Sequence, residues 1–486
     1  MYKRIIYLIL VSLIAVVYSC QKKDVISDDT SLKLEFSNDS IIFDTVFTTL
    51  GSATHRLMIY NRSNSKIKIS DIQLEGGSSS QFRVNLDGES GSQFSDIEIE
   101  GNDSLFLFAK VTIDPNNVSN PFVVEDKLHF LTNNNQQEVK LVAWGQNANY
   151  ILADTYTPGF PPYKVVADSL ETVHWTSEKP YVIYGFAVID SYGELIIDEG
   201  TKVYFHEASG LWAYADGLLK VYGTPENKVY FRGDRLEQDY ADIPGQWDRI
   251  WLMEAPQGED HIIENAVIEN GFIGLQAESF LRAATNQLIL HNVIVQNMSG
   301  IGLFSRFYNI ESSNTLLANC GGYCLALTAG GNYDFKHTTI ANFWNFSVRN
   351  TPSLFLNNYI LDSLDNPTAI PFNLSMGNSI VYGYNKNELE TDMDGGADSV
   401  YSFNYCLLKT DLNTTNTSNF NSILKNKDPL FVAPTENDYR IDTLSPVIGF
   451  GDVNIANEVP FDLEGISRLP SPDLGVYQFV PGQEEK

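Results

Sequence analysis

The chain has 486 residues, 25 of them Tyr and 28 Phe, and only 19% are charged, which is typical of a folded protein of two or three domains. A formal net charge of -29 argues against nucleic acid and anionic lipid surfaces as partners, because both are themselves negatively charged. The same charge disfavours a polyanionic substrate such as pectate unless bound cations or a local basic patch intervene. Neutral glycans and proteins therefore remain candidate partners.

The N-terminal segment predicts export. Lys3 and Arg4 precede an apolar run, 5–17, that is too short to cross a bilayer comfortably. The run ends in Val-Tyr-Ser-Cys at 17–20, which resembles a bacterial lipobox, although the residue before Ser19 is a Tyr where a small side chain is usual. An uncleaved anchor and an ordinary signal peptide are the alternatives.

The lipobox resemblance implies that 1–20 is a lipoprotein signal peptide and that Cys20 carries lipid as the first residue of the mature chain. Residues 21–31 would then be a polar tether. Because no Asp follows Cys20, the resemblance implies anchorage in the outer membrane or on the cell surface.

Residues 32–146 show short alternating strands separated by polar turns, which predicts a β-sandwich. Asp44-Thr-Val-Phe47, Tyr60-Asn61 and the closing Trp144-Gly-Gln146 resemble the immunoglobulin-like modules that accompany repeats in bacterial surface proteins. The resemblance implies a stalk, with glycan binding as an alternative. Residues 147–162 contain three prolines and are expected to form an extended linker.

One short phrase then recurs: Asn265-Ala-Val-Ile-Glu-Asn270 returns at 292–297, 314–319 and 337–342, so that its last Asn recurs in steps of 27, 22 and 23 residues. A period in the twenties with short β-branched strands and Asn corners favours a parallel β-helix over helical repeats. The corner residues expected to form a structural ladder, through left-handed backbone angles and stacked amides, are Asn270, Asn297, Asn319 and Asn342.

The coils at 193–205 and 217–231 each carry two alternating strands around a Gly-Thr corner, and resemble the opening coils of right-handed parallel β-helix repeat surface lipoproteins of Gram-negative bacteria. The expected fold is therefore all-β: an immunoglobulin-like β-sandwich, then a right-handed parallel β-helix, a pectate-lyase-like solenoid, over 163–445. Motifs from Asp428 onward resemble the closing motif of such proteins, and 446–486 is expected to cap the last coil.

An insertion at 231–251 interrupts the coils with charged and aromatic residues, and functional residues of solenoids collect on such loops. It is interpreted as a structural brace, a ligand-binding surface or a catalytic loop. Its candidate ligand-binding residues are Arg232, Asp234, Arg235, Asp242, Trp247, Asp248 and Arg249.

The sequence does not reveal a reaction, and the catalytic residues stay unknown. Paired-His metal motifs, a nucleophile elbow and nucleotide-binding loops are all missing from the sequence. The acids at 390–398 suggest calcium only weakly, so no cofactor or metal is expected. Cys320, Cys324 and Cys406 are interpreted as packing residues. For Cys320 and Cys324, a disulfide or half a metal site is the alternative.

We expect a non-catalytic binding or structural protein with a glycan or a surface protein as partner. The alternative is a polysaccharide lyase or glycoside hydrolase on the same scaffold.

Overall fold

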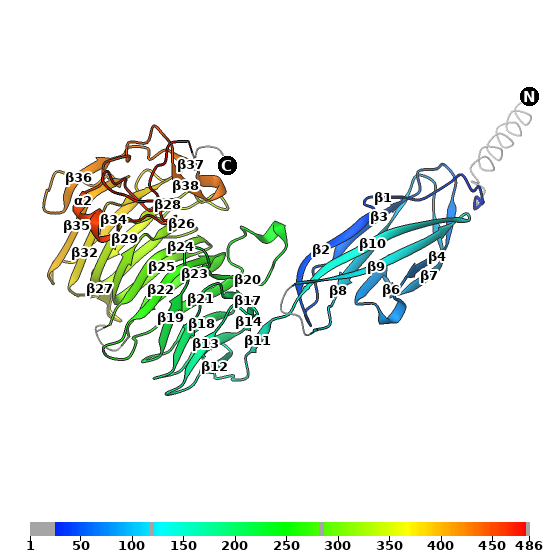
Figure 1. Cartoon of the computed structure of the whole chain (residues 1–486), viewed down its shortest axis with the longest axis horizontal. Helices are drawn as coiled ribbons and strands as arrows, with labels where there is room; N and C mark the ends of the chain where they lie inside the picture. Colours follow the sequence, from blue (N-terminus) through cyan, green and yellow to red (C-terminus); the bar gives the residue numbers. More distant parts are fainter. Residues whose placement is uncertain (1–24, 117–120, 281–285, 483–486) are drawn as a thin grey trace, which may run out of the picture. The chain divides into compact units, whose positions relative to one another are not determined.

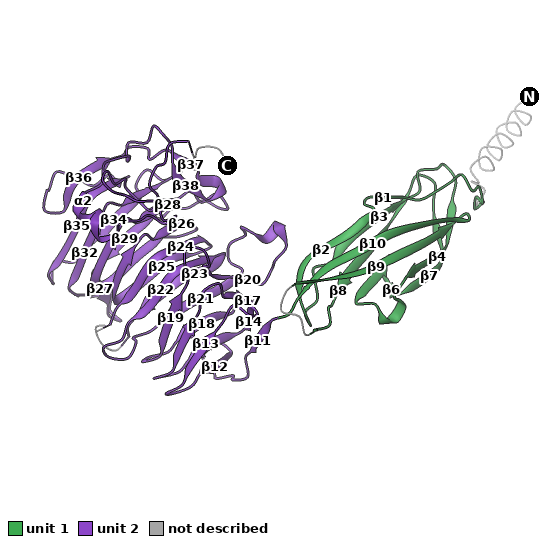
Figure 2. Cartoon of the chain, in the orientation of Figure 1, with its two compact units in different colours: residues 1–147 green, residues 148–486 purple. Residues whose placement is uncertain are grey.

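The structure is a computed structural model that describes residues 25–116, 121–280 and 286–482. It is almost entirely β, and it divides into two compact units, residues 1–147 and 148–486 (Figures 1 and 2). Cys20, the expected lipidation site, lies outside the described residues. Within the described ranges, no helix is both long enough and apolar enough to cross a membrane.

The first unit contains two five-stranded sheets that share one core. Every pair of neighbouring strands in them is antiparallel except β2 and β10, which run parallel. Alternate residues such as Phe43, Leu107 and Phe130 point into the core, as a period of two requires. The sheet orders are β1 (Glu35–Phe36), β3 (His55–Tyr60), β8 (Ser104–Val111), β5 (Phe82–Leu86) and β6 (Glu89–Gly91), and β2 (Ser40–Phe47), β10 (Asn135–Gln146), β9 (Phe122–Thr132), β4 (Ile67–Leu74) and β7 (Gln93–Ile99).

The second unit is built on one sheet of 24 strands, in which the early strands pair in parallel with the third strand along the chain. The first strands are β11 (Asn149–Leu152), β12 (Tyr163–Ala167), β13 (Thr172–Trp175), β14 (Tyr181–Tyr184), β15 (Phe186–Ile189), β16 (Glu194–Ile197), β17 (Lys202–Phe205), β18 (Gly210–Ala213), β19 (Leu218–Tyr222), β20 (Val229–Gly233) and β21 (Trp247–Leu252). Strand β11 lies inside 147–162, so part of the expected linker belongs to this sheet.

Several later strands are longer, and some turn a corner without leaving the sheet. Strand β22 pairs with β19 through its first half and with β20 through its second half, because Asn265 between the halves takes a left-handed backbone angle, φ +48°. The later strands are β22 (His261–Glu269), β23 (Gly271–Glu278), β24 (Leu288–Met298), β25 (Ile301–Ser313), β26 (Leu316–Cys320), β27 (Leu325–Lys336), β28 (Thr339–Asn342), β29 (Leu354–Asn357), β32 (Phe372–Gly377), β33 (Ile380–Gly383), β34 (Leu389–Asp392), β35 (Ser399–Leu408) and β36 (Phe420–Lys425).

The pairings define three faces of the second unit. Face A comprises β14, β17, β20, the second halves of β22 and β24, and β26, β28 and β33. Face B comprises β15, β18, β21, β23, the first halves of β25 and β27, and β29 and β34. Face C comprises β16, β19, the first halves of β22 and β24, the second halves of β25 and β27, and β32 and β35.

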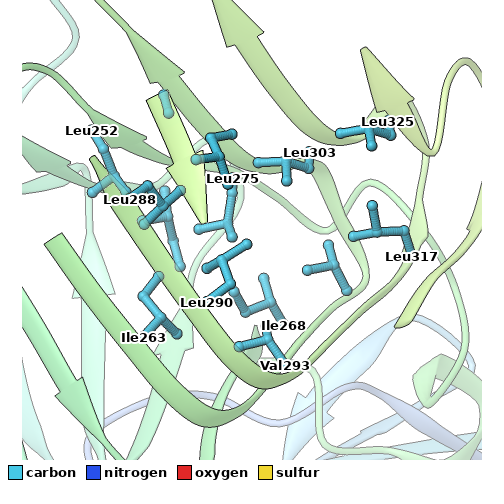
Figure 3. Close-up of a cluster of buried hydrophobic side chains, with 14 of the residues drawn as sticks. Leu252, Ile263, Ile268, Leu275, Leu288, Leu290, Val293, Leu303, Leu317 and Leu325 are labelled. Atoms are coloured by element: carbon cyan, nitrogen blue, oxygen red, sulfur yellow. The ribbon is translucent and has the colours of Figure 1, made fainter. Parts of the chain in front are cut away.

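Inward side chains from all three faces fill one continuous core. Leu252, Leu275 and Leu303 come from face B, whereas Ile263 and Ile268 come from the two halves of β22 (Figure 3). Equivalent residues of successive strands therefore stack in columns, about 4.8 Å apart along the sheet. Cys320, Cys324 and Cys406 are free and buried; burial raises the pKa of Cys406 to about 12, which agrees with a packing role.

The C-terminal strap, residues 428–480, packs along face A. Tyr439, Leu463 and Val476 lie against Leu316 and Ala341, and other strap residues lie against β33 and β35. The strap contains the pair β37 (Phe431–Ala433) and β38 (Asp438–Ile441), and helix α2 (Val453–Glu458), which Asp452 caps. The segment expected to cap the last coil lies along the side of the coils from β26 to β36, where it covers apolar outward residues.

Smaller elements complete the described chain: a hairpin, β30 (Tyr359–Leu361) and β31 (Pro367–Ala369), and three single-turn 3₁₀ helices, η1 (Gly77–Ser79), η2 (Gln238–Tyr240) and η3 (Pro434–Glu436).

Candidate functional site

An open groove of about 760 Å³ runs along face C, across β25, β27 and β32. A cavity of this size lies within the range of small-ligand sites. Its lining is polar: Asp260, Asn286, Gln287, Asn309, Glu311, Asn332, Asp334, Asn373 and Ser375.

The strand register places these polar side chains in rows. Asn309 pairs with Asn332, and Glu311 pairs with Asp334, in the neighbouring strands β25 and β27. The amide of Asn332 donates to Oδ1 of Asn309 at 2.9 Å, so the two amides form a short ladder on the groove wall. On the next strand, Asn373 continues the row.

Asn286 forms part of the groove and is almost completely buried, with 2% of its surface exposed. Its Nδ2 donates to the hydroxyl of Tyr308 at 2.8 Å, but its Oδ1 finds no hydrogen-bond partner within the described parts of the chain. Because buried polar atoms are nearly always paired, this oxygen is an exception within the wall of the groove.

Hydrogen-bond acceptors outnumber donors in the groove. Asp260 receives the backbone N–H of Gln287 at 2.8 Å, and Asp334 pairs with Lys336 at 2.8 Å, which leaves further carboxylate oxygens open. Burial alone would lower the pKa of Lys336, but its hydrogen bonds to Asp334 and Glu458 raise that pKa, so Lys336 stays charged. The groove therefore suits a ligand that donates hydrogen bonds.

A metal ion is the other kind of ligand that carboxylates attract. Among residues 25–116, 121–280 and 286–482, no group of three or more His, Cys, Asp or Glu side chains could hold one, and this includes the acids at 390–398.

The insertion loop does not enter this groove. On face A, Arg232 pairs with Glu269 at 3.4 Å, and Gln296 donates to the same carboxylate at 3.3 Å. Farther along, Asp242 accepts from Asn297 at 3.4 Å and from Asn437 of the strap at 3.2 Å. These contacts tie the loop down on face A.

The start of the loop contacts earlier coils. Oδ2 of Asp234 lies 2.8 Å from Nδ1 of His206, whose ring stacks on Tyr184 at 4.3 Å. Burial raises the pKa of Asp234, and the hydrogen bond from His206 opposes this rise. Burial and the nearby charge of Asp234 raise the pKa of Tyr184 to about 12.

Arg235 closes on its own loop. Its guanidinium bonds to Glu237 at 3.0 Å and lies over the ring of Tyr240, 3.8 Å from the centroid. Such a closed local pair leaves little charge for an external ligand.

The end of the loop leads to the core and to face B. Trp247 is buried, stacks on Phe205 at 4.4 Å and donates its indole N–H to the carbonyl of Glu269. Trp247 is therefore a core residue and does not face a ligand.

Asp248 and Arg249 pair at 2.8 Å, and Arg249 also donates to Gln276 at 2.5 Å. Gln276 in turn donates to Glu278 at 2.6 Å. Burial raises the pKa of Glu278, with the contact to Gln276 opposing the rise. The seven loop residues are thus spread over two faces and the core and do not form one site.

The side-chain ladder differs from the expected one. Asn270, Asn297 and Asn319 do take left-handed angles, but their amides bond to Ala241, Asp242 and Asn437, in the insertion loop and the strap. Asn342 bonds to the backbone of Cys320.

The amide ladder is formed by the first Asn of the first three phrases. Asn292 donates to Asn265 at 3.0 Å, and Asn314 donates to Asn292 at 2.9 Å. The two Asn positions differ because of what lies beside them. The first Asn lies at the corner between faces C and A, where consecutive coils are in register. The second Asn contacts the insertion loop and the strap, which fold back over face A.

The groove residues were not found from the sequence, although a signal existed. Asn309 and Asn332 are 23 residues apart, a coil period, and Glu311 and Asp334 have the same separation. A column of polar residues at that period is visible in the sequence only once the register of the coils is known.

Comparison with known proteins adds little. No family model matches the chain, and no curated protein matches it. The chain is similar to PapD-like domain 7 of human CEP192, with a TM-score of 0.18 and 13% identity over 26% of this chain and 92% of that one. It is similar to the periplasmic chaperone SfaE, with a TM-score of 0.17 and 12% identity over 24% and 58% of the two chains.

It is also similar to a family 123 glycoside hydrolase from Clostridium perfringens, with a TM-score of 0.17 and 9% identity. That match covers 24% of this chain and only 27% of the hydrolase. At TM-scores this low, none of these likenesses carries an argument about function.

Proposed function

We propose that this protein is a lipid-anchored protein of the outer membrane or cell surface that binds a neutral glycan, without cleaving it, in the groove on face C. We also propose that its first unit is an immunoglobulin-like sandwich and its second a right-handed parallel β-helix. The parallel pairing of each early strand with the third one along the chain supports the second assignment. Val17-Tyr-Ser-Cys20 supports the anchor.

One observation carries the binding function: an open groove of about 760 Å³ lined by amides and carboxylates in register, Asn309 with Asn332 and Glu311 with Asp334. Paired amides such as Asn309 and Asn332 can both donate to and accept from vicinal hydroxyls.

A neutral glycan fits the chemistry of this groove better than other ligands. Sugar hydroxyls donate to Asp260, Glu311 and Asp334, whereas an acidic glycan would meet their negative charge. Successive strands repeat about every 4.8 Å, comparable with the length of one sugar residue, so a chain along the groove meets similar groups at each step.

An enzyme is the second candidate. Glu311 and Asp334 are register neighbours in the groove, and a glycoside hydrolase needs two carboxylates that flank the scissile bond. A polysaccharide lyase is the other enzymatic form of this hypothesis. Because β-elimination needs a uronate residue, a separate incubation with polygalacturonate, followed by ultraviolet absorbance, tests it.

The test uses the chain without residues 1–20 and a panel of neutral polysaccharides: xylan, mannan, galactan and mixed-linkage glucan. Affinity electrophoresis measures binding, and reducing ends and ultraviolet absorbance measure cleavage. We expect retention by at least one polysaccharide and no cleavage. Cleavage would refute the non-catalytic proposal, and absence of retention by the whole panel would refute neutral-glycan binding.

Variants locate the site. Asn332→Ala and Glu311→Gln should each weaken retention about tenfold, the effect of losing one or two well-placed hydrogen bonds. The matched controls are Asn421→Ala on β36 and Glu178→Gln, both exposed and outside the groove. Equal losses in the variants and the controls would place the ligand elsewhere.

The anchor has its own test. Expression of the full chain in a Gram-negative host should give a membrane-bound product that incorporates labelled fatty acid, and Cys20→Ser should abolish the labelling. Labelling that survives this substitution would refute lipidation at Cys20.

A further inference from the structure

Three cations lie on the outward face of the first unit's β3–β8–β5 sheet. Arg56 on β3 is paired in register with Phe108 on β8, and Arg83 on β5 is paired with Lys110 on β8. All three cationic side chains are exposed. Such a cluster is unexpected in a chain whose net charge is -29.

No carboxylate among the described residues pairs with these three cations. The guanidinium of Arg56 lies 5.6 Å from the centre of the Phe106 ring. Arg83 donates through one nitrogen to the backbone carbonyls of Ser80 and Phe82, which hold its stem in place and leave other N–H groups open. The ammonium of Lys110 faces solvent.

Two aromatic rings accompany the cations. Phe106 and Phe108 are 40% and 37% exposed, and their rings lie nearly parallel, with centroids 6.3 Å apart. Together the two rings give this face a small apolar surface directly beside the cations.

A cleft of about 760 Å³ opens beside these residues. Arg83, Lys110 and Phe108 line it, together with the polar side chains of Asn85, Ser90 and Ser92. None of its lining residues is an Asp or Glu. The cleft thus offers positive charge, an aromatic ring and neutral hydrogen-bonding groups at one place.

We propose that this face binds an acidic polysaccharide. The carboxylates of its uronate residues pair with Arg83, Lys110 and Arg56; an arginine fork matches a carboxylate in two hydrogen bonds. The apolar faces of the sugar rings pack on Phe106 and Phe108, and the hydroxyls bond to the amide and serines of the cleft.

The composition of the face favours a glycan over an acidic protein. A protein partner would need a larger apolar centre than two phenylalanines, whereas a sugar ring matches one aromatic ring in size. The overall negative charge opposes any polyanion, but a polyanion can bind where a local basic patch outweighs that field within a Debye length, about 10 Å at moderate salt.

The experiment compares ligands that differ only in charge, with the chain lacking residues 1–20. The probes are polygalacturonate, its fully methyl-esterified form, alginate, hyaluronan and poly-L-glutamate, with affinities measured at low and high salt. We expect binding to at least one acidic polysaccharide, weakening with salt, and little binding to the methyl ester or to poly-L-glutamate.

Charge-reversal variants place the ligand. Arg56→Glu and Lys110→Glu should each lower the affinity about tenfold or more. The control Lys140→Glu makes the same charge change at an exposed position on β10, in the other sheet. A control that loses as much affinity as the variants would overturn the assignment to this face.

Three other results would overturn the proposal. Equal binding of the methyl ester would show that charge is not recognised. Equal binding of poly-L-glutamate would show that sugar is not recognised, and absence of binding to every acidic polysaccharide would remove the ligand class altogether.

Discussion

Breaking the buried ion pair of Arg349 and Glu388 tests whether this pair stabilises the second unit. The carboxylate of Glu388 has no exposed surface, and Arg349 is bound to it through two nitrogens, at 2.6 and 2.9 Å. Ser353 donates to the same carboxylate through its backbone N–H and its hydroxyl, and the backbone of Asn385 donates at 2.8 Å. All acceptor positions of the carboxylate are therefore used.

Replacing Arg349 with Met leaves a buried carboxylate that keeps three neutral donors but loses the one cation that the described residues place beside it. Removing one partner of a buried pair costs about 3–5 kcal/mol, because the remaining charge is left without compensation. Unfolding a unit of about 340 residues changes the entropy by roughly 0.7 kcal/mol/K, so the midpoint should fall by about 4–7 °C.

Differential scanning calorimetry measures this shift, and the first unit serves as an internal reference because it has its own core. We expect only the transition of the second unit to move. The double variant Arg349→Met/Glu388→Leu should recover a large part of the loss, since no charge is then buried. A shift below about 1 °C in the single variant would refute the reasoning.

Three further predictions concern the second unit. Burial lowers the pKa of His261 to about 4, below the value near 6.5 in an unfolded chain. The unfolded chain therefore binds the proton first, and the free energy of unfolding should fall by up to about 3 kcal/mol as pH falls from about 6.5 to 4. His261→Gln should flatten this fall, as measured by denaturation at several pH values. Arg468→Met removes a buried guanidinium that donates to Asn314 at 2.7 Å and to the Val476 carbonyl. The strap should then detach more often and expose apolar surface, which increases the binding of a hydrophobic dye. Unchanged dye binding would contradict this. Asn314→Ala breaks the amide ladder and puts Ala at φ +50°. The free energy of unfolding, measured by calorimetry, should therefore fall by about 2–4 kcal/mol. The exposed control Asn421→Ala should lower it by less than about 0.5 kcal/mol.

The sequence predicted the all-β character and the repeat because both depend on local patterns. Asn265-Ala-Val-Ile-Glu-Asn270 places Ala266 and Ile268 in the core and puts left-handed Asn residues at both corners, and the phrase at 292–297 repeats this arrangement. Alternation and corner chemistry are properties of neighbouring residues, so a sequence displays them directly.

The position of the C-terminal strap could not be read in the same way. Its contacts join Arg468 to Asn314 and Asn437 to Asn319, residues more than a hundred positions apart. The same limit hid the groove, because one of its strand pairs, β27 with β32, forms across the intervening strands β28 to β31. Long-range register decides such features, and no local pattern encodes it.

The outward side chains of face A explain why that face is covered, whereas the groove lies on face C. Along face A the register runs from Arg232 through Glu269 and Gln296 to Ala318 and Ala341, so the row changes from polar to small and apolar. The insertion loop covers the polar part and the strap covers the apolar part.

Asp242 of the insertion loop joins the two covers through Asn437 of the strap. Face A is therefore occupied by the chain itself, and the loop that looked most like a binding site acts as part of this cover. On face C, the side chains of Asn309, Glu311 and Asp334 line a groove that the described residues leave open. Under the proposed function, a ligand chain that follows the coils of this unit reaches the polar columns of face C without displacing any described part of the fold.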